Sequence, residues 1–291
     1  MSTSTSVLLA VVSIASIIPG AAFAQSHEFT AVSWNVASGH ADLQMSALRV
    51  AAAQGVDLWG LCEVRNQEWA KTLVEAAGEN EPGQFAGIVS ATGGNDLSCI
   101  IYDQSQFAFV RAYEIKWVNR LWYYPGMPVR PPLVAHLRHI ASGQEFLFMV
   151  NRLYGCQLEK QAGALNAWAR GRSLPIVAMG TYDFQYDPDS GPLYPEGQQA
   201  LLAFVADGVF RWLTPANPVA TLNWDRKVID DFAFVANTFG KLSGDSQIVV
   251  EPGDFADSDL QSDHRPVQAV FTVSDVDTEM TSNTSSILVI P

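Results

Sequence analysis

An acid and a histidine stand side by side near the C-terminal end of the chain. Residues 261–267 contain Asp263-His264 directly before residues 268–273, whose alternating apolar and polar side chains predict a half-buried strand. A carboxylate can hold a divalent metal ion, and an imidazole can exchange a proton with a phosphoryl or acyl oxygen. The pair alone is equally typical of a polar loop, so its meaning depends on the residues upstream.

Two predicted strands in the N-terminal part of the chain also end in polar residues. Residues 29–36 are apolar and predict a buried strand that ends near Asn35, and residues 56–64 predict a second one that carries Glu63 near its end. A carboxylate in such apolar surroundings is costly unless it is used or paired. Between the two strands, residues 43–54 have the spacing of an amphipathic helix.

The same arrangement recurs further along the chain. Residues 174–180 predict a buried strand that enters a loop at 181–184, and residues 232–236 predict a strand that follows Asp230 and Asp231. The other predicted elements are strands at 98–102, 134–137 and 145–153, and helices at 67–77 and 158–170. Strands with intervening helices, and polar residues at strand ends, predict an α/β (α+β) sandwich with a site along one sheet edge.

Composition limits the class of protein. The chain has 291 residues, of which 48% are hydrophobic, enough for one large domain with a full core. A net charge of −13 argues against capture of nucleic acid by a basic face, although a phosphodiester substrate remains compatible if a cation sits in the site. Cys62, Cys99 and Cys156 allow at most one internal disulfide, and the first two lie in strand-like runs where cysteine also serves as a buried apolar residue.

The two ends of the chain differ from its middle. Residues 7–18 form an apolar run of signal-peptide length, and Ala22-Phe23-Ala24 fits a small-x-small cleavage site, although no Lys or Arg precedes the run. We therefore expect a signal peptide at 1–24 and a secreted or periplasmic protein. Residues 25–273 form one expected domain, and the Ser/Thr/Asp-rich residues 274–291 an expected disordered tail. No other segment of the sequence is apolar for long enough to span a membrane.

Taken together, the strand-end motifs resemble the endonuclease/exonuclease/phosphatase superfamily of deoxyribonuclease-like enzymes. The matching stretches, in order, are Ser33-Trp34-Asn35-Val36, Gly60-Leu61-Cys62-Glu63-Val64, Asn151-Arg152-Leu153, Met179-Gly180-Thr181-Tyr182-Asp183, Asp231-Phe232-Ala233-Phe234-Val235 and Ser262-Asp263-His264-Arg265-Pro266. Each motif is weak singly, and six in order cover nearly all of residues 29–273. The resemblance implies a four-layer sandwich of two packed, mostly antiparallel β-sheets flanked by helices.

The resemblance also implies a metal-assisted site. Asn35 and Glu63, with Asp263 close by, would hold a divalent cation, Mg²⁺ or Mn²⁺, and Asn35 would also belong to the catalytic set. Magnesium prefers a few oxygen ligands and keeps water and substrate oxygens for the rest, which suits this set. His264, oriented by Asp231, would sit against the scissile phosphate.

Two neighbouring acids compete for the histidine. We select Asp231 over Asp230 because the run that begins at Asp231 matches the acid-then-apolar strand of the family in register. Neighbouring side chains of a strand point to opposite faces, so only one of the two acids is expected to reach His264.

Two motifs depart from the family pattern. The usual Asn-His-Leu is here Asn-Arg-Leu, and Arg152 can grip a phosphate through two hydrogen bonds but cannot exchange protons near neutral pH. The usual Gly-Asp-Phe-Asn is here Gly-Thr-Tyr-Asp, so Thr181 replaces the acid that orients the attacking water. We expect Arg152 and Thr181 to contact the phosphate and Asp183 to take over water activation. Loss of a positioned base lowers the rate by ~10²–10⁴-fold.

Three functions follow as hypotheses. The first is a secreted, divalent-metal-dependent phosphodiester hydrolase, with nucleic acid as the leading substrate and a nuclease as the leading identity. The second is a catalytically inactive member of the superfamily that binds a phosphorylated ligand or a protein. The third is a phospholipase C of the sphingomyelinase type, whose aromatic cluster at 122–124, within the Pro-rich residues 117–132, would meet a membrane interface.

Overall fold

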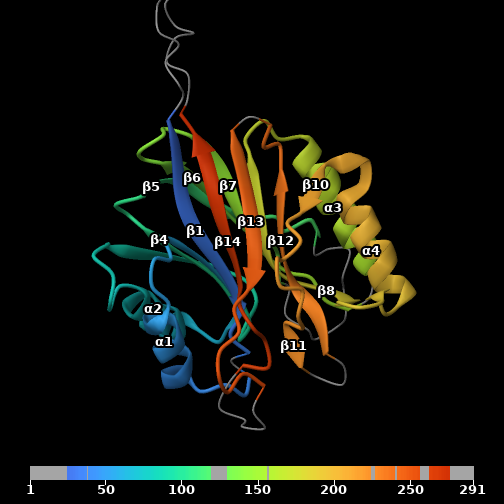
Figure 1. Cartoon of the computed structure of the whole chain (residues 1–291), viewed down its shortest axis with the longest axis horizontal. Helices are drawn as coiled ribbons and strands as arrows, with labels where there is room; N and C mark the ends of the chain where they lie inside the picture. The colour runs from blue at the N-terminus through green and yellow to red at the C-terminus, as the bar shows by residue number, and fades with distance from the viewer. Residues whose placement is uncertain are drawn as a thin grey trace, which may run out of the picture.

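The first of two β-sheets contains both ends of the described chain. The computed structural model describes residues 25–37, 39–118, 130–155, 157–223, 227–239, 241–255 and 262–275. The six strands of this sheet are β1 (Ser26–Asn35), β2 (Leu58–Val64), β3 (Phe85–Val89), β4 (Leu97–Asp103), β13 (Leu242–Ile248) and β14 (Val267–Ser274). Their order is β13-β14-β1-β2-β4-β3 (Figure 1). The last strand thus lies beside the first, which brings the loop before β14 to the end of β1.

The second sheet is built from the middle of the chain. Its strands are β5 (Phe107–Glu114), β6 (Leu133–His139), β7 (Glu145–Arg152), β8 (Ile176–Asp187), β9 (Gly191–Pro192), β10 (Phe210–Trp212), β11 (Leu222–Asn223) and β12 (Lys227–Ala236). The order is β10-β12-β8-β7-β6-β5, with β9 on β8 and β11 on β12. Among the described strands, only the pairs β1–β2 and β7–β8 run parallel.

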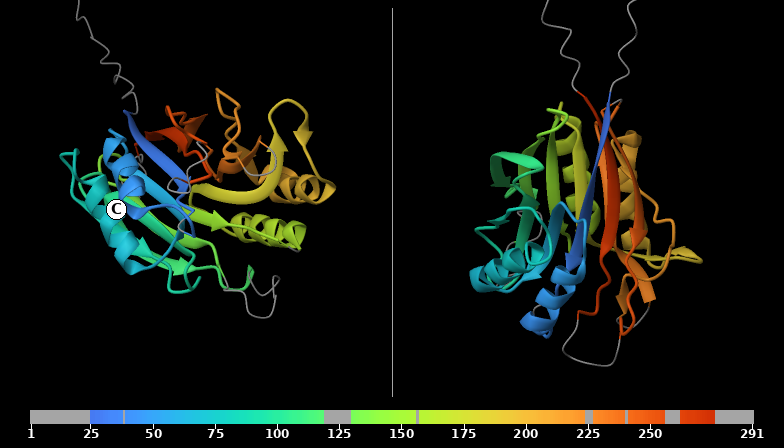
Figure 2. Two further views of the ribbon diagram at one scale, coloured as in Figure 1. Left: turned by 90° about the horizontal axis from the view of Figure 1, so that it is seen from below. Right: turned by 60° about the vertical axis from the view of Figure 1, so that its left-hand side comes forward.

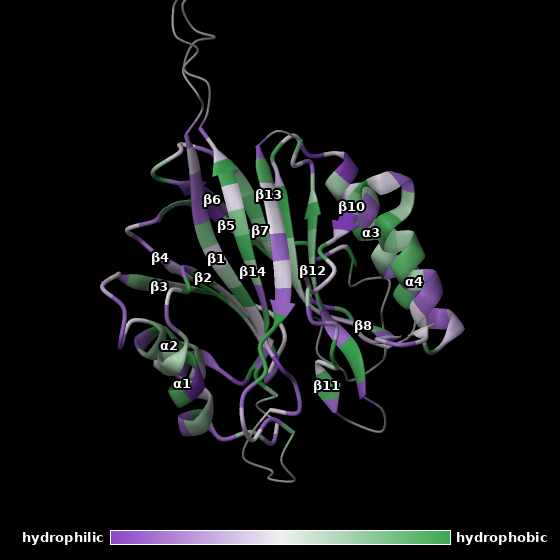
Figure 3. Ribbon diagram, in the orientation of Figure 1, coloured by the Kyte–Doolittle hydropathy of each residue, from purple (hydrophilic) through white to green (hydrophobic). Residues whose placement is uncertain are grey.

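The two sheets pack face to face through aromatic side chains. Phe29 of β1 stacks on Phe146 of β7, with ring centroids 5.4 Å apart, and meets Phe107 of β5 edge-on at 5.2 Å. Burial of several rings between two sheets is a large apolar contribution to folding. The strands β12 and β14 carry hydrophobic colour along much of their length in Figure 3, as expected for elements of a sandwich core.

Helices cover the two outer faces (Figures 1 and 2). The helices α1 (Leu43–Ala52) and α2 (Gln67–Ala77) pack on the six-stranded sheet, where Leu73 joins a cluster with Trp59 of β2. The helices α3 (Leu158–Arg170) and α4 (Pro195–Val205), followed by the single turn η2 (Ala206–Gly208), cover the eight-stranded sheet. Phe204 of α4 contacts the ring of Tyr182 on β8. The predicted four-layer sandwich is therefore confirmed.

The first two helices begin with side-chain caps. Asp42 accepts hydrogen bonds from the first-turn amides of α1, and Asn66 accepts one from the amide of Trp69 at the start of α2. Such caps satisfy backbone N–H groups that the helix itself leaves without partners. Helices α2 and α3 have the predicted bounds, whereas α1 ends at Ala52, two residues early. Elements β3, β5, β13 and α4 were not predicted.

One predicted loop is wrong. Residues 181–184 were expected to leave the sheet, but β8 continues to Asp187. The continuation has a partner, because β12 pairs with β8 from Ala236 opposite Ile176 to Ile229 opposite Tyr186. The partner strand provides hydrogen bonds for backbone N–H and C=O groups that would bind water in a loop. Residues 181–187 therefore belong to the strand.

Several expectations fall outside the described residues. These are the signal peptide at 1–24, the part of the expected tail from residue 276 onward, Cys156 and the aromatic cluster at 122–124, all of which stay predictions. Ser274, the first residue of the expected tail, instead ends β14. Cys62 and Cys99 are buried, free thiols. In the part of the chain that the structure describes, no helix is long and apolar enough to cross a membrane.

Candidate active site

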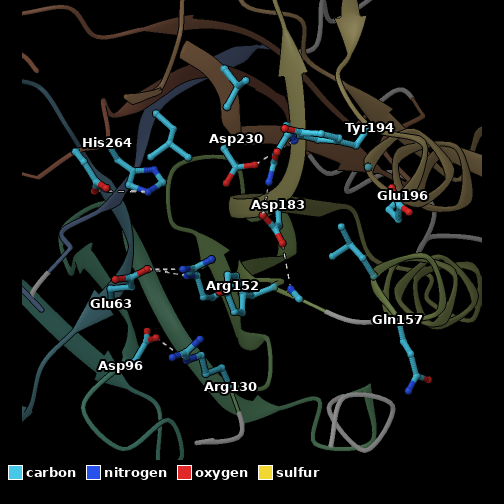
Figure 4. Close-up of a pocket in the computed structure, with 18 of the residues that line it drawn as sticks. Glu63, Asp96, Arg130, Arg152, Gln157, Asp183, Tyr194, Glu196, Asp230 and His264 are labelled. Atoms are coloured by element: carbon cyan, nitrogen blue, oxygen red, sulfur yellow. Dashed lines mark hydrogen bonds and ion pairs between the residues drawn. The ribbon is translucent and has the colours of Figure 1, made fainter. Parts of the chain in front are cut away.

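A cavity of about 900 Å³ lies where the two sheets and the starts of α3 and α4 meet (Figure 4). This volume lies within the ordinary range of small-molecule sites. The charged and aromatic side chains that line it are His40, Glu63, Asp96, Arg130, Arg152, Tyr154, Glu159, Asp183, Tyr194, Glu196, Asp230, Asp263 and His264. They come from both sheets, so neither sheet alone makes the site.

His264 and Asp231 form a buried pair on one wall of the cavity. The Nδ1 atom of His264 lies 2.6 Å from Oδ2 of Asp231. Burial alone would lower the pKa of His264, but the charge and hydrogen bond of Asp231 raise the pKa to about 9. The imidazole is therefore protonated at neutral pH, and its Nε2 faces Asn35 at 3.4 Å and Asp263 at 3.8 Å.

Thr181 holds the other oxygen of Asp231. Its hydroxyl donates to Oδ1 of Asp231 at 2.6 Å and accepts from Nδ2 of Asn35 at 3.3 Å. Thr181 is fully buried and is not among the residues that line the cavity. Gly180 precedes it with φ +137°, and a Cβ there would collide with the carbonyl oxygen of Asn151. This geometry supports Thr181 as a positioning residue behind the dyad rather than as a phosphate contact.

The loop that carries His264 is tied to the end of β1. Ser262 donates to the backbone oxygen of Asn35 at 2.6 Å and accepts from the amide of His264 at 3.0 Å. The indole of Trp34 donates to the backbone oxygen of His264 at 3.0 Å. The Ser-Asp-His and Ser-Trp-Asn motifs, far apart in sequence, are thus held together by their own polar atoms.

Glu63 and Arg152 form a second pair, next to the first. Both Nε and Nη2 of Arg152 contact Oε1 of Glu63, at 2.9 and 2.5 Å, and Nδ2 of Asn35 donates to the same oxygen at 2.9 Å. Burial would raise the pKa of Glu63, but Arg152, Asn35 and His264 together lower it. Glu63 has φ 55° at an irregularity in the β2–β4 pairing, a conformation that is uncommon outside glycine and clusters at functional sites.

A third pair and an aromatic ring extend this wall. Arg130 contacts Asp96, with Nε and Oδ2 at 2.5 Å. Burial and the charge of Glu63 raise the pKa of Asp96 to about 6 despite this partner. Tyr154 lies beside both arginines, with its ring centroid 5.2 Å from Cζ of Arg152 and 6.0 Å from that of Arg130. Two guanidinium groups and a phenol ring therefore share one side of the cavity.

The cavity also contains two carboxyl groups, Asp183 and Asp230, that form no ion pair among the described residues. Asp183, at φ 56°, accepts from the amide of Gly155 at 3.0 Å and from the side chain of Gln185 at 3.2 Å. Asp230 accepts from the amide of Gln185 at 3.2 Å (Figure 4). Burial and the charges of Asp183 and Asp231 raise the pKa of Asp230 to about 7. Asp230 is therefore only about half ionised at neutral pH.

The expected alternation of Asp230 and Asp231 is not strict. The pairing of β12 with β8 is irregular between Ile229 and Asp231, and the hydroxyl of Thr221 accepts from the amides of both acids. Such an irregularity re-aims side chains that a regular strand would send to opposite faces. Asp231 reaches His264, and Asp230 also borders the cavity.

The three residues expected to hold a metal do not present their oxygens together. Oδ1 of Asn35 accepts from the amide of Ala37, so the amide nitrogen faces Glu63. Oε1 of Glu63 is occupied by Arg152, and Asp263 lies beside His264 and His40. Within the described part of the chain, no group of three or more His, Cys, Asp or Glu residues converges on one point. Because Oδ1 of Asn35 and Oε1 of Glu63 are already engaged by Ala37 and Arg152, the donor set as arranged does not fit a magnesium ion.

The structure thus brings most of the predicted residues to one place. Among those predicted, the ones that line the cavity are Glu63, Arg152, Asp183, Asp263 and His264, while Asn35, Thr181 and Asp231 stand behind them. Sequence reasoning missed Asp96, Arg130 and Tyr154. Asp96 carried no signal, because it belongs to an irregular segment without a motif. Arg130 lies near the end of the Pro-rich residues 117–132, a long loop of the kind that can border a substrate site. Tyr154 directly follows Asn-Arg-Leu, which was a usable signal.

Comparisons with known proteins agree on the fold. No family model and no curated protein sequence matches the chain. Among solved structures, an endonuclease/exonuclease/phosphatase family protein from Bacteroides thetaiotaomicron is 19% identical with a TM-score of 0.63, and the match covers 86% of this chain and 97% of that one. A mannosyl-6-phosphatase from the same species is also 19% identical, with a TM-score of 0.57 and coverage of 83% and 98%.

A third similar structure comes from an animal. The D. rerio TDP2 complexed with single-strand DNA product is 15% identical, has a TM-score of 0.61, and is matched over 84% of this chain and 98% of that one. The chain therefore has the fold of the endonuclease/exonuclease/phosphatase proteins. At these identities the likeness establishes the fold alone, and the chemistry has to be argued from the cavity.

Proposed function

We propose that the protein is a phosphoester hydrolase. The observation that carries this proposal is the buried His264, 2.6 Å from Asp231, at a cavity that also contains the guanidinium of Arg152. Two positively charged groups that line one cavity suit the oxygens of a phosphate ester. The fold supports the proposal, since a mannosyl-6-phosphatase and TDP2 with a DNA product share it.

The cavity residues suggest how the reaction would proceed. A water oxygen bonds to phosphorus while the ester P–O bond breaks, and the water proton passes to the carboxylate of Asp183. Arg152 hydrogen-bonds the phosphoryl oxygens and balances the charge that grows on them. His264 gives its Nε2 proton to an oxygen of the phosphate or leaving group, and Asp231 stabilises the imidazolium and its orientation. Asn35 and Thr181 position these groups from behind.

The surroundings of the cavity restrict the substrate. Asp183, Asp230 and Asp263 oppose additional phosphates, and the chain has a net charge of −13. We expect a small phosphodiester, or the end of a nucleic acid chain, to be hydrolysed more readily than the middle of a duplex. The signal peptide expected at 1–24 would place this activity outside the cytoplasm.

Turnover by the purified chain tests this proposal. The substrates are bis-p-nitrophenyl phosphate, RNA and plasmid DNA, each with Mg²⁺, with Mn²⁺ and with EDTA, and the His264→Ala variant controls for contaminating enzymes. The expected result is turnover that this variant loses. No turnover of any ester under any of these conditions would refute the proposal. The EDTA arm separately tests the metal dependence expected from the sequence resemblance.

A second candidate is an inactive protein that binds a phosphorylated ligand. The observation that favours it is Thr181, whose hydroxyl replaces a carboxylate and donates to Asp231 instead of holding water. Under this hypothesis the triple change Arg152→His, Thr181→Asp and Asp183→Asn raises hydrolysis by orders of magnitude. Under the hydrolase proposal Asp183→Asn alone lowers it, because Asp183 accepts the water proton. Measuring both variants on bis-p-nitrophenyl phosphate separates the two functions.

A further inference from the structure

Arg152 binds one carboxylate oxygen of Glu63 through two of its nitrogens. Its Nε and Nη2 atoms lie 2.9 and 2.5 Å from Oε1 of Glu63, at the end of β2, while Arg152 itself ends β7. Asn35 donates a third N–H group to the same oxygen. With three N–H groups on Oε1, this oxygen has little capacity left for a cation. A metal ion could reach Glu63 only through Oε2, close to the guanidinium.

The pair is protected from solvent and supported on its far side. The exposed fractions of the Arg152 and Glu63 side chains are 13% and 22%, and the guanidinium lies over the ring of Tyr154 at 5.2 Å. Because salt screens a partly buried ion pair only weakly, the attraction between Arg152 and Glu63 should persist at physiological ionic strength. A divalent ion bound directly to Glu63 would lie within a few ångströms of the guanidinium, where like charges repel strongly.

The guanidinium has donors to spare for an anion. It carries five N–H groups, more than its contacts with Glu63 and with the backbone oxygen of Leu153 use. It lines the cavity on the same side as Arg130. An arginine held rigidly by a carboxylate and open to a cavity is a preorganised anion site.

From this arrangement we propose that Arg152 is a built-in replacement for the divalent cation at Glu63, and that phosphate binds at this site without metal. One residue then accounts for two differences. Arg152 replaces the histidine of the Asn-His-Leu motif, and it also supplies the positive charge that a metal ion would bring to Glu63. The choice of phosphate as the bound anion rests on the proposed function. The first half, exclusion of metal, does not.

Metal binding is tested with Mn²⁺ and the purified full chain. Electron paramagnetic resonance counts bound ions in the wild type, Glu63→Gln, Arg152→Met, and the double variant of both. We expect wild type and Glu63→Gln to bind alike, and Arg152→Met to gain a site that the double variant loses. Arg152→Gln repeats the test if Arg152→Met fails to fold. Arg211→Met, which removes an exposed arginine outside the cavity, is the matched control.

Phosphate binding is tested by calorimetry with inorganic phosphate, in EDTA and in excess Mg²⁺. We expect equal affinity in both, and about a 10- to 100-fold loss in Arg152→Met but not in Arg211→Met.

A Glu63-dependent Mn²⁺ site in the wild type, or no gain of one in the Arg152 variants, overturns the exclusion of metal. Phosphate binding that requires Mg²⁺ overturns the second half. Absence of both phosphate binding and ester turnover, with the Mn²⁺ pattern as expected, counts against the proposed function alone.

Discussion

Two carboxylate–cation pairs lie next to each other in the cavity, with Asn35 between them, and they differ in what their cations can do. Asp231 holds His264 at 2.6 Å, and Glu63 holds Arg152 at 2.5 Å. An imidazole can release its proton within the physiological range of pH, whereas a guanidinium keeps its charge at any such pH. Two similar contacts in one cavity therefore supply a proton donor, His264, and a permanent positive charge, Arg152.

This comparison shows how residues of a site can change while each buried carboxylate keeps a partner for its charge. Asn35 touches both pairs, since its Nδ2 lies near Glu63, Thr181 and His264. The change to arginine leaves Glu63 compensated, and the change to threonine leaves Asp231 with two hydrogen-bond partners. Buried charges without such partners would be strongly destabilising.

The largest expected effect comes from breaking the Asp231–His264 pair. His264→Ala and Asp231→Asn should each lower kcat/KM by ~10²–10⁴-fold, because the proton donor or its orientation is lost. The double variant should be little worse than His264→Ala alone, because the two residues act as a unit. Steady-state kinetics on bis-p-nitrophenyl phosphate checks this. A larger loss in Asp230→Asn than in Asp231→Asn would show that the wrong acid has been assigned.

Breaking the Glu63–Arg152 pair should affect stability. Arg152→Met leaves a largely buried carboxylate without its cation, and we expect a loss of about 3 kcal/mol in the free energy of unfolding. Adding Glu63→Gln should recover part of that loss, because the uncompensated charge is gone. Urea denaturation of both single variants and the double variant measures the coupling. Independent, additive effects would mean that the pair is not energetically linked.

The histidine pair should also give stability its own dependence on pH. The folded-state pKa of His264, about 9, lies above the ordinary value of 6.5. Its contribution to stability is therefore fully present below pH 6.5 and is lost as the pH rises through about 9. Each tenfold difference in proton affinity between the folded and unfolded chains corresponds to about 1.4 kcal/mol. Thermal unfolding from pH 6 to 9.5 should show this decline in the wild type and a smaller one in Asp231→Asn, and equal slopes would contradict the assignment.

The smallest expected effect on activity belongs to Asp230. Its folded-state pKa, about 7, lies above the ordinary value of 3.8, so stability falls as the pH rises from about 4 to 7 and the buried carboxyl ionises. Asp230→Asn should therefore be more stable than the wild type at pH 8, by about 1 kcal/mol or more, and nearly equal at pH 4. Hydrolysis should change little. Urea denaturation at both pH values measures the difference, and a destabilised variant at pH 8 would contradict it.

Many of the helices and strands of the fold could be predicted from local sequence patterns. Helix α3 and helix α2 have the predicted bounds because apolar spacing and, for α2, the Asn66 cap act within a few residues. The chain of strand-end motifs indicated the sandwich. The extension of β8 through Asp183 could not be predicted, because its cause is pairing with β12, a strand that begins only at Lys227.

The sequence by itself determined which polar residues stand at strand ends and in what order, and with them the fold and the residues Asn35, Glu63, Asp231 and His264. Only the tertiary structure decided their partners. Arg152 meets Glu63 because β7 and β2 end at the same place in different sheets, and Thr181 meets Asp231 because β8 lies beside β12. These contacts depend on sheet packing and register between distant segments, which no local pattern encodes.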